Sequence, residues 1–154
     1  MKFFYDRFFP IIKTENRNYK HKAVIGIGGN QGDVRKRFKN LYVYFRRSSL
    51  VSISETSPIL KNPPFGYLDQ NDFYNAIMVI RTSLSSKRFL KFLLYIEKIF
   101  GRKRSFKNAP RKLDLDIIFF DKIKTKTRSL ILPHPYWRER ESVVLPLLSL
   151  KRKI

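Results

Sequence analysis

Residues 73–100 read FYNAIMVIRTSLSSKRFLKFLLYIEKIF, and this stretch contains the change of hydrophobic period that decides the fold. In its first ten residues, Ala76, Met78 and Ile80 alternate with a second set of side chains that includes Ile77 and Val79. Because successive side chains of a strand point to opposite faces, this pattern predicts a strand over Phe73–Thr82. Both faces carry apolar residues, so we expect one face to pack on helices and the other on a loop.

The second half of the same stretch predicts a helix that ends near Phe100. Ser85 or Ser86 is a suitable N-cap, and Gly101 is typical of the residue that follows the last helical turn. The expected apolar stripe of this helix consists of Leu90, Leu93, Leu94, Ile96 and Ile99.

Elements of the same two kinds flank this strand and helix. Upstream we predict a strand over Ala23–Ile27, a helix that begins after Asp33 with Val34, Phe38, Leu41 and Phe45 inside, and a strand over Leu50–Thr56. Downstream we predict a strand over Leu113–Phe120 and a final apolar helix near 142–150. The order β-α-β-β-α-β predicts an α+β fold, a ferredoxin-like sandwich whose antiparallel sheet carries two helices on one face.

Two segments remain, residues 57–72 and the N-terminal residues 1–21. Residues 57–72 contain three prolines and a glycine, which indicates a long loop. We expect residues 1–21 to be a basic N-terminal extension, either a short amphipathic helix or disordered, and residues 22–154 to form the domain. Asp6 and Arg7 interrupt the only apolar run near the start, so we do not expect a signal peptide.

Composition narrows the function classes. The chain has 154 residues, 43% of them hydrophobic, which fits one globular domain. It has no cysteine, which excludes disulfides, cysteine zinc sites and thiol catalysis. The net charge of +21 attracts polyanions, although a lysine-rich genome is an equal explanation. No segment approaches the roughly 18 apolar residues of a membrane span. We therefore expect a cytoplasmic monomer with no membrane partner.

The sharpest chemical feature is the run Leu113-Asp114-Leu115-Asp116-Ile117. Two carboxylates at i and i+2 of a strand share a face, where they repel each other unless a cation lies between them. Magnesium takes one or two protein carboxylates and completes its coordination shell with phosphate oxygens and water. The alternative is a solvated strand face whose carboxylates form salt bridges.

Basic residues lie directly before this pair of carboxylates, and they suit a polyphosphate. They are Arg102, Lys103, Arg104, Lys107, Arg111 and Lys112. His134 and Arg140, further along the chain, could also hold phosphate oxygens, although a structural role is an alternative for this histidine. The sequence Gly28-Gly29-Asn30 is neither a Walker loop nor a dinucleotide fingerprint, and we expect a simple turn there.

Phe73 and Asn75 share one face of their predicted strand. An aromatic ring for stacking and an amide for paired hydrogen bonds would suit a flat heterocycle. Packing in the core is the alternative for both side chains.

Taken together, several motifs resemble the 6-hydroxymethyl-7,8-dihydropterin pyrophosphokinase family over about residues 22–150. The motifs are Ala23–Asn30, Asp69-Gln70, Asp72–Ala76, Glu97, Gly101-Arg102, Pro110–Ile117 and Leu132–His134. The resemblance implies a ferredoxin-like fold, ATP as cosubstrate, two Mg²⁺ ions, AMP as a product, and attack of the pterin hydroxyl on the β-phosphorus of ATP. It implies a pterin partner and no specific nucleic acid.

The resemblance also implies roles for individual residues. Asp114 and Asp116 would bind the metal ions, and Arg102 and Arg111 would act in catalysis. The resemblance implies no dedicated general base, and our closest candidate for one is Asp116. The ATP-binding positions would be Glu97, Arg104, Ile117, His134 and Arg140. The pterin-binding positions would be Thr56, Phe65, Phe73 and Asn75. Residues 57–72 and 102–110 would close over the substrates.

Three positions depart from the family. Leu94 replaces a glutamine that contacts ATP, Asn108 lies near the place of a tryptophan, and Ser142 replaces an aromatic residue that caps the pterin. Phe73 therefore has Tyr136 or Trp137 as candidate stacking partners. The alternatives to an active enzyme are a basic ferredoxin-like RNA-binding module, for which we find no aromatic RNA-binding motif, and a relative that has lost activity.

Overall fold

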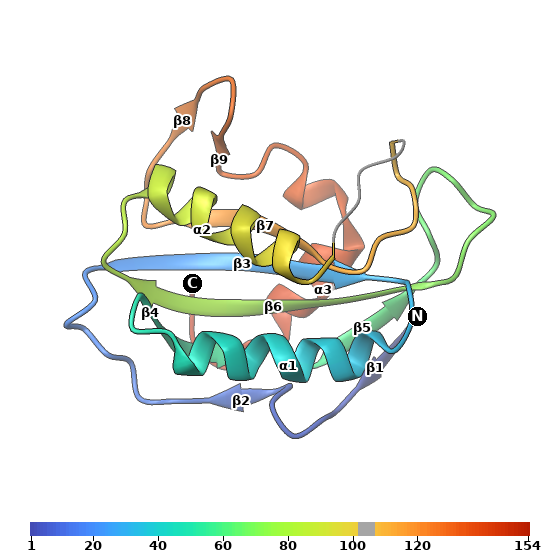
Figure 1. Ribbon diagram of the computed structural model, residues 1–154, viewed down its shortest axis with the longest axis horizontal. Coiled ribbons are helices and arrows are strands. Elements are labelled where there is room, and N and C mark those ends of the chain that lie inside the picture. The colour runs from blue at the N-terminus through green and yellow to red at the C-terminus, as the bar shows by residue number, and fades with distance from the viewer. Residues whose placement is uncertain (102–106) are drawn as a thin grey trace.

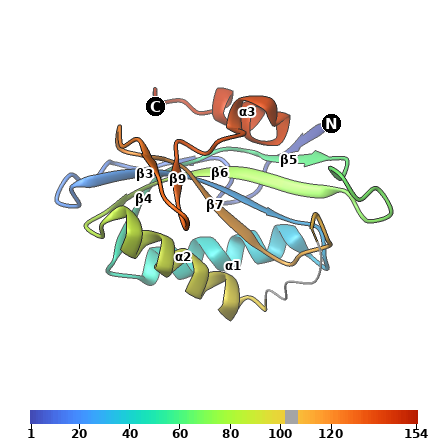
Figure 2. The same cartoon turned by 90° about the horizontal axis from the view of Figure 1, so that it is seen from above.

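The computed structural model describes residues 1–101 and 107–154, and it is built on one antiparallel sheet with helices on both faces (Figures 1 and 2). The ferredoxin-like elements are β3 (His21–Gly29), α1 (Val34–Arg47), β4 (Val51–Thr56), β5 (Ile59–Asn62), β6 (Phe73–Thr82), α2 (Ser86–Ile99) and β7 (Asp114–Phe120). Strands β5, β6, β3 and β7 follow one another across the sheet, and β4 pairs with the second half of β6. The predicted ferredoxin-like fold is therefore confirmed.

Helices α1 and α2 cover one face of the sheet, as Figure 2 shows. The side chain of Asp33 caps α1 by accepting from the backbone N–H of Lys36, and Ser85 caps α2 by accepting from that of Arg88. The four apolar positions expected inside α1 are all buried. Gly101 has φ +83°, which confirms it as the left-handed residue after α2.

The expected apolar stripe of α2 is wrong at two positions. Leu94 and Ile99 are 42% and 49% exposed, whereas Phe89 in the first turn is fully buried. The buried set of α2 is Phe89, Leu93, Ile96 and Glu97, at helical spacing. Leucines occupy adjacent positions in this helix, and hydrophobicity alone does not say which of them faces the sheet.

On the opposite face, α3 (Glu141–Leu148) packs over part of the sheet where we expected a loop, as Figure 2 shows. Val143 of α3 packs with Val24, Ile77 and Ile118 in a second, smaller core. Trp137, in the short 3-10 helix η1 (Trp137–Glu139), packs edge-on against Phe119 in the same region. The short hairpin β8 (Thr125–Lys126) and β9 (Ile131–Leu132) joins β7 to this segment.

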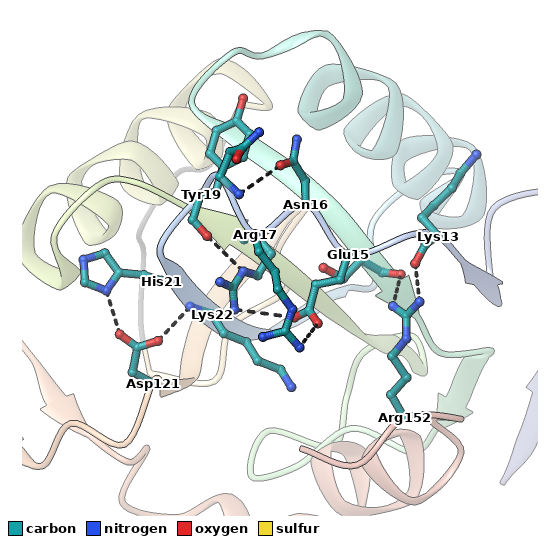
Figure 3. A network of polar contacts seen from close by, with 12 residues as sticks. Lys13, Glu15, Asn16, Arg17, Tyr19, His21, Lys22, Asp121 and Arg152 are labelled. Carbon is teal, nitrogen blue, oxygen red and sulfur yellow. Dashed lines mark hydrogen bonds and ion pairs between the residues drawn. The ribbon is translucent and has the colours of Figure 1, made fainter.

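The N-terminal segment is neither a helix nor disordered, which corrects our expectation. Strand β1 (Lys2–Phe4) pairs with β5, and β2 (Ile11–Ile12) pairs with β4, so the segment extends the free edge of the sheet. Figure 3 shows how the residues that follow are fastened: His21 and the backbone of Lys22 bond to Asp121, and the C-terminal Arg152 donates to the carbonyl of Lys13.

Two further expectations differ from the structure. The predicted loop at 57–72 contains β5, because after Ser57 the chain returns to pair with the first half of β6. Gly28 and Gly29 are not a turn but the last residues of β3. A methyl group on Gly29 would overlap the carbonyl oxygen of Lys112, so a close approach of two backbones requires this glycine. None of the helices in the described part of the chain is long and apolar enough to span a membrane.

Candidate active site

The paired carboxylates lie on the sheet face opposite α1 and α2. Asp114 of β7 pairs with Gly28 of β3, and on the other side of Gly28 lies Asn75 of β6. Cross-strand partners share a face, so these residues form one row across three strands. A methyl group on Gly28 would lie 2.6 Å from the amide oxygen of Asn75. Because Gly28 has no side chain, β3 places no side-chain atom between the carboxylate of Asp114 and the amide of Asn75.

The two carboxylates have different environments. Nη1 of Arg111 donates to Oδ2 of Asp114 across 2.7 Å. Burial, with the neighbouring charge of Asp114 next in importance, raises the pKa of Asp116 to about 7. Glu97 adds to this effect, while Arg140 and Arg111 oppose it. The protein thus holds a carboxylate that is hard to ionise unless positive charge is brought to it.

This pair fits magnesium. Within residues 1–101 and 107–154, no group of three or more His, Cys, Asp or Glu side chains forms a complete metal site. Asp114 and Asp116 supply two oxygen-donor side chains on one face, which leaves the other coordination positions for phosphate oxygens and water, as Mg²⁺ prefers. A bound cation would also offset the charge of Asp114, which after burial is the second cause of the raised pKa of Asp116.

His134 is held beside this pair by its backbone. Its N–H donates to the carbonyl of Ile118 at 2.9 Å, at the end of β7. Burial and the charge of Arg140 lower the pKa of the imidazole, with Asp114 opposing them. Nδ1 accepts from the N–H of Tyr136 at 3.2 Å, so the neutral ring carries its proton on Nε2. Nε2 can therefore donate to a phosphate oxygen.

Glu97 supports β7 from the other direction. Its carboxylate, on a side chain that is 2% exposed, accepts from the backbone N–H of Leu115 at 2.6 Å. That N–H points away from β3, and by the two-residue period of a strand the backbone groups of Ile117 point the same way. The outer edge of β7 thus presents backbone hydrogen-bonding groups beside His134.

The predicted pterin residues are only partly brought together. Phe73 and Asn75 lie on the same face of β6, and Nδ2 of Asn75 donates to Oδ1 of Asn62 at 2.6 Å. Phe65 is 73% exposed in the loop after β5, so it is not buried with them. Thr56 is fully buried, and its hydroxyl is bonded to the N-terminal segment, so its side chain does not face Phe73 and Asn75.

Tyr136 and Trp137, the candidates for the second face of the pterin, have other neighbours in this structure. Trp137 packs on Phe119, and Tyr136, which is 59% exposed, lies beside His134 and Arg140. The group found over the Phe73 ring is the guanidinium of Arg111, with its carbon 5.9 Å from the ring centroid. Arg111 therefore contacts both the carboxylate of Asp114 and the ring of Phe73.

Asn30 and Gln70 are residues to which the sequence assigned no role. Asn30, 3% exposed, accepts from the N–H of Arg111 and donates to Oε1 of Gln70 and the carbonyl of Asn71. Gln70 in turn donates to the carbonyl of Asn108 at 2.8 Å. The loop after β5 and the loop before β7 are thereby joined through two side-chain amides. The only signal for either residue was its place in the family motifs. The predicted site residues Arg102 and Arg104 lie outside the described residues.

Sequence comparisons with known proteins identify the family of this chain. The sequence model of the family described as 7,8-dihydro-6-hydroxymethylpterin-pyrophosphokinase (HPPK) matches residues 24–152. The chain belongs to this family. It is 45% identical over 143 residues to a 2-amino-4-hydroxy-6-hydroxymethyldihydropteridine pyrophosphokinase of Helicobacter pylori, covering 92% of this chain and 88% of that protein.

The chain is also similar to two other proteins named 2-amino-4-hydroxy-6-hydroxymethyldihydropteridine pyrophosphokinase. The Campylobacter jejuni protein is 44% identical over 141 residues, which cover 92% of this chain and 90% of that protein. The Bacillus subtilis protein is 33% identical over 132 residues, which cover 86% and 79%. Membership of the pyrophosphokinase family disfavours the RNA-binding alternative, because the fold and the motifs are both those of the family.

Proposed function

We propose that this site transfers a pyrophosphoryl group from ATP to 6-hydroxymethyl-7,8-dihydropterin, giving AMP and the pterin diphosphate, in folate biosynthesis. The observation that carries the proposal is the row of Asp114, Gly28 and Asn75 across three strands in a chain that belongs to the pyrophosphokinase family. The row sets a phosphate-side carboxylate and a pterin-side amide on one sheet face.

The reaction makes one bond and breaks another at the β-phosphorus of ATP. The hydroxyl oxygen of the pterin attacks that phosphorus, the bond to the oxygen bridging the α- and β-phosphates breaks, and AMP leaves. Asp116 is the candidate acceptor for the hydroxyl proton. Phosphoryl transfer depends mainly on positioning and charge neutralisation, which the arrangement of this site favours.

Asp114 and Asp116 would hold two Mg²⁺ ions, which supply charge neutralisation and orientation of phosphate oxygens when bound. Support for this comes from the raised pKa of Asp116, since a buried carboxylate next to another is ionised readily only beside positive charge.

The phosphate side combines fixed donors. Arg111 projects its guanidinium at the carboxylate pair, and neutral His134 offers Nε2–H near Arg140. Arg102 and Arg104 would add charge to the same side. Such donors stabilise charge that develops as AMP leaves. Glu97 and the backbone of Ile117 would bind the nucleoside along the outer edge of β7.

The pterin side would be formed by Phe73, Asn75 and the backbone near Thr56, with Phe65 joining them when its loop closes. Asn75, already oriented by Asn62, would pair with the polar edge of the heterocycle. The guanidinium of Arg111 lies over the ring of Phe73 in this structure. For the pterin to stack on Phe73, this guanidinium would have to move aside or lie next to the pterin.

The setting of the enzyme follows from its substrates. We propose that it works in the cytoplasm, where ATP and the reduced pterin are available, and that it acts as a monomer without a membrane or nucleic-acid partner.

The test is release of AMP from ATP and Mg²⁺ by the full-length protein, with and without 6-hydroxymethyl-7,8-dihydropterin. We expect AMP only when the pterin is present. ATP binding to a folded protein without any pterin-dependent AMP would contradict the proposal and point to a relative that has lost activity.

A further inference from the structure

Residues 1–13, which we call the strap, lie outside the residues 24–152 that the family's sequence model matches. The strap runs along one edge of the sheet, where β1 pairs with β5 and β2 pairs with β4. The sheet order places β1 at one end and β7, which carries the two aspartates, at the other. The strap is therefore adjacent to the pterin side and remote from the phosphate side.

The strap is anchored by aromatic packing and by an ion pair. Phe9 is fully buried, and the ring of Phe8 stacks on Tyr42 of α1 with centroids 4.2 Å apart. Both oxygens of the Asp6 carboxylate accept from the guanidinium of Arg35, and this contact lowers the pKa of Asp6. These contacts bury apolar rings and pair a half-buried charge, so the strap is part of the folded core rather than a loose tail.

The first link from the strap to the substrate side is the hydroxyl of Thr56. It donates to the carbonyl of Phe8 and accepts from the N–H of Ile11 at 2.9 Å. Thr56 is 1% exposed, and a hydroxyl with both of these bonds fixes the end of β4. The backbone that follows leads directly to Ser57, which is bonded to Ile77 of β6 through its backbone N–H and its side-chain oxygen.

The second link is β5. Three residues of β1 pair with Ile59, Leu60 and Lys61, so β5 is held between β1 and β6. Oδ1 of its last residue, Asn62, accepts a hydrogen bond from Nδ2 of Asn75 at 2.6 Å. The ring of Phe4 also lies 6.0 Å from that of Tyr74, the neighbour of Asn75. Movement of β5 would therefore change the orientation of the Asn75 amide.

We infer that the strap is a positioning element for the pterin substrate, acting through Thr56 at the end of β4 and through Asn62 on Asn75. This inference rests on the proposed function. An edge strand of four residues is weakly held when it is paired on one side only, and β1 supplies the second side. The strap contacts no substrate itself; it fixes the strands whose residues do.

The experiment compares Phe4→Ala with Phe92→Ala in the full-length protein. Both phenylalanines are half-buried against the main core, and Phe92 lies on α2 beside Phe45 and Phe89. Both variants lose ring packing and some stability. We expect only Phe4→Ala to raise the KM for the pterin, by roughly three- to tenfold, with the KM for ATP unchanged, because uniform binding is lost on one side of the site.

A second pair removes a hydroxyl instead of a ring. Thr56→Val and Thr82→Val each delete a buried hydroxyl that donates to a backbone carbonyl and accepts a backbone N–H, but Thr82 lies at the far end of β6. We expect a raised pterin KM in Thr56→Val only. If Phe4→Ala does not fold, the comparison of Thr56→Val with Thr82→Val still tests whether the strap positions the pterin-binding residues.

Hydrogen exchange gives a readout independent of turnover. In Phe4→Ala the amides of residues 60–62 should exchange faster than in wild type, and in Phe92→Ala they should not. Equal changes of pterin KM in both members of each pair, or an equal rise of the KM for ATP, would overturn the inference. Absence of pterin-dependent AMP release in wild type would instead contradict the proposed function, before any variant is compared.

Discussion

The guanidinium of Arg111 donates to the carboxylate of Asp114 across 2.7 Å while its backbone N–H donates to the buried amide of Asn30. One arginine is thus fixed at two points, by the end of β3 and by the first carboxylate of β7. Its guanidinium carbon also lies 5.9 Å from the centroid of the Phe73 ring. Arg111 therefore stands between the proposed phosphate side and the proposed pterin side of the site.

Replacing Arg111 by alanine should lower turnover more than pterin affinity. Loss of a fixed charge that acts on the transferring group costs about 10²–10³ in kcat. Arg111→Lys should recover only part of this, since an ammonium group cannot reproduce the guanidinium geometry. Steady-state kinetics check the split, with the exposed Arg17→Ala as the control. A rise in pterin KM alone, with kcat unchanged, would contradict the role assigned to Arg111.

Asp114→Asn and Asp116→Asn should each abolish Mg²⁺-dependent turnover and leave the protein folded. The amide keeps the shape of the carboxylate but removes the charge that a hard cation requires. Asp121→Asn is the matched control, because Asp121 pairs with His21 away from the carboxylate pair. Circular dichroism and kinetics at saturating Mg²⁺ check both statements. Near-normal rates in either site variant would remove the metal role from that residue.

Magnesium binding should depend on pH near neutrality. With its pKa raised to about 7, Asp116 of the metal-free protein must lose a proton before a cation binds, so affinity for Mg²⁺ should fall as pH drops below about 7. The same shift affects stability. Between pH 4 and 7 the folded state holds a proton that the unfolded state has released, so the free energy of unfolding should decrease as pH rises through this range.

Calorimetric titration with Mg²⁺ at several pH values and chemical unfolding of the metal-free protein measure these two effects. In Asp116→Asn the part of the stability change assigned to this residue should vanish. An Mg²⁺ affinity that is constant from pH 5 to pH 8 would show that Asp116 ionises as an ordinary exposed carboxyl group.

The two amides that join the loops should act as a unit. Asn30→Ala and Gln70→Ala each break the bond between Nδ2 of Asn30 and Oε1 of Gln70. The two changes together should therefore cost less than the sum of the single changes, by about 0.5–3 kcal/mol of coupling energy in stability or in kcat/KM. Gln31→Ala, an exposed neighbour, is the control. Strictly additive effects would mean that the loops are not coupled through this pair.

Gly29→Ala should destabilise the protein far more than Gly26→Ala. A methyl group on Gly29 would overlap the backbone carbonyl of Lys112, whereas on Gly26 its nearest neighbour would be a side-chain carbon of Ile118 at 3.5 Å. Overlap with a backbone atom forces a shift of the strand and typically costs 1–3 kcal/mol or more. Thermal unfolding compares the two variants. Equal melting temperatures would show that the β3–loop contact adapts without cost.

Local pattern predicted much of this fold. The alternation at 73–82 predicted the bounds of β6 correctly. Asp33 was predicted as one cap and Ser85 or Ser86 as the other, because such side chains can satisfy free N–H groups, and the structure selects Ser85. The strap was missed because its partner strands β5 and β4 lie far away in sequence, and β5 was missed because it is only four residues long and lies in a proline-rich segment. The exposure of Leu94 likewise depends on how α2 sits on the sheet.

The site was predicted from residue type and order, but its connections were not. Asp114 and Asp116 could be placed on one face by the period of a strand alone. The bond from Glu97 to the backbone of Leu115, the position of Arg111 over Phe73, and the bridge from Asn30 to Gln70 all join residues from separate elements. No local rule gives such contacts, because they follow from the packing of the whole domain.

Mass spectrometry of the pterin after incubation with ATP, Mg²⁺ and the full-length protein identifies the group that is transferred. We expect that 6-hydroxymethyl-7,8-dihydropterin gains two phosphate groups in one step and that the nucleotide product is AMP. A pterin carrying a single phosphate with ADP as the nucleotide product would mean attack at the γ-phosphorus, and an unmodified pterin would mean no transfer. Either result would contradict the account.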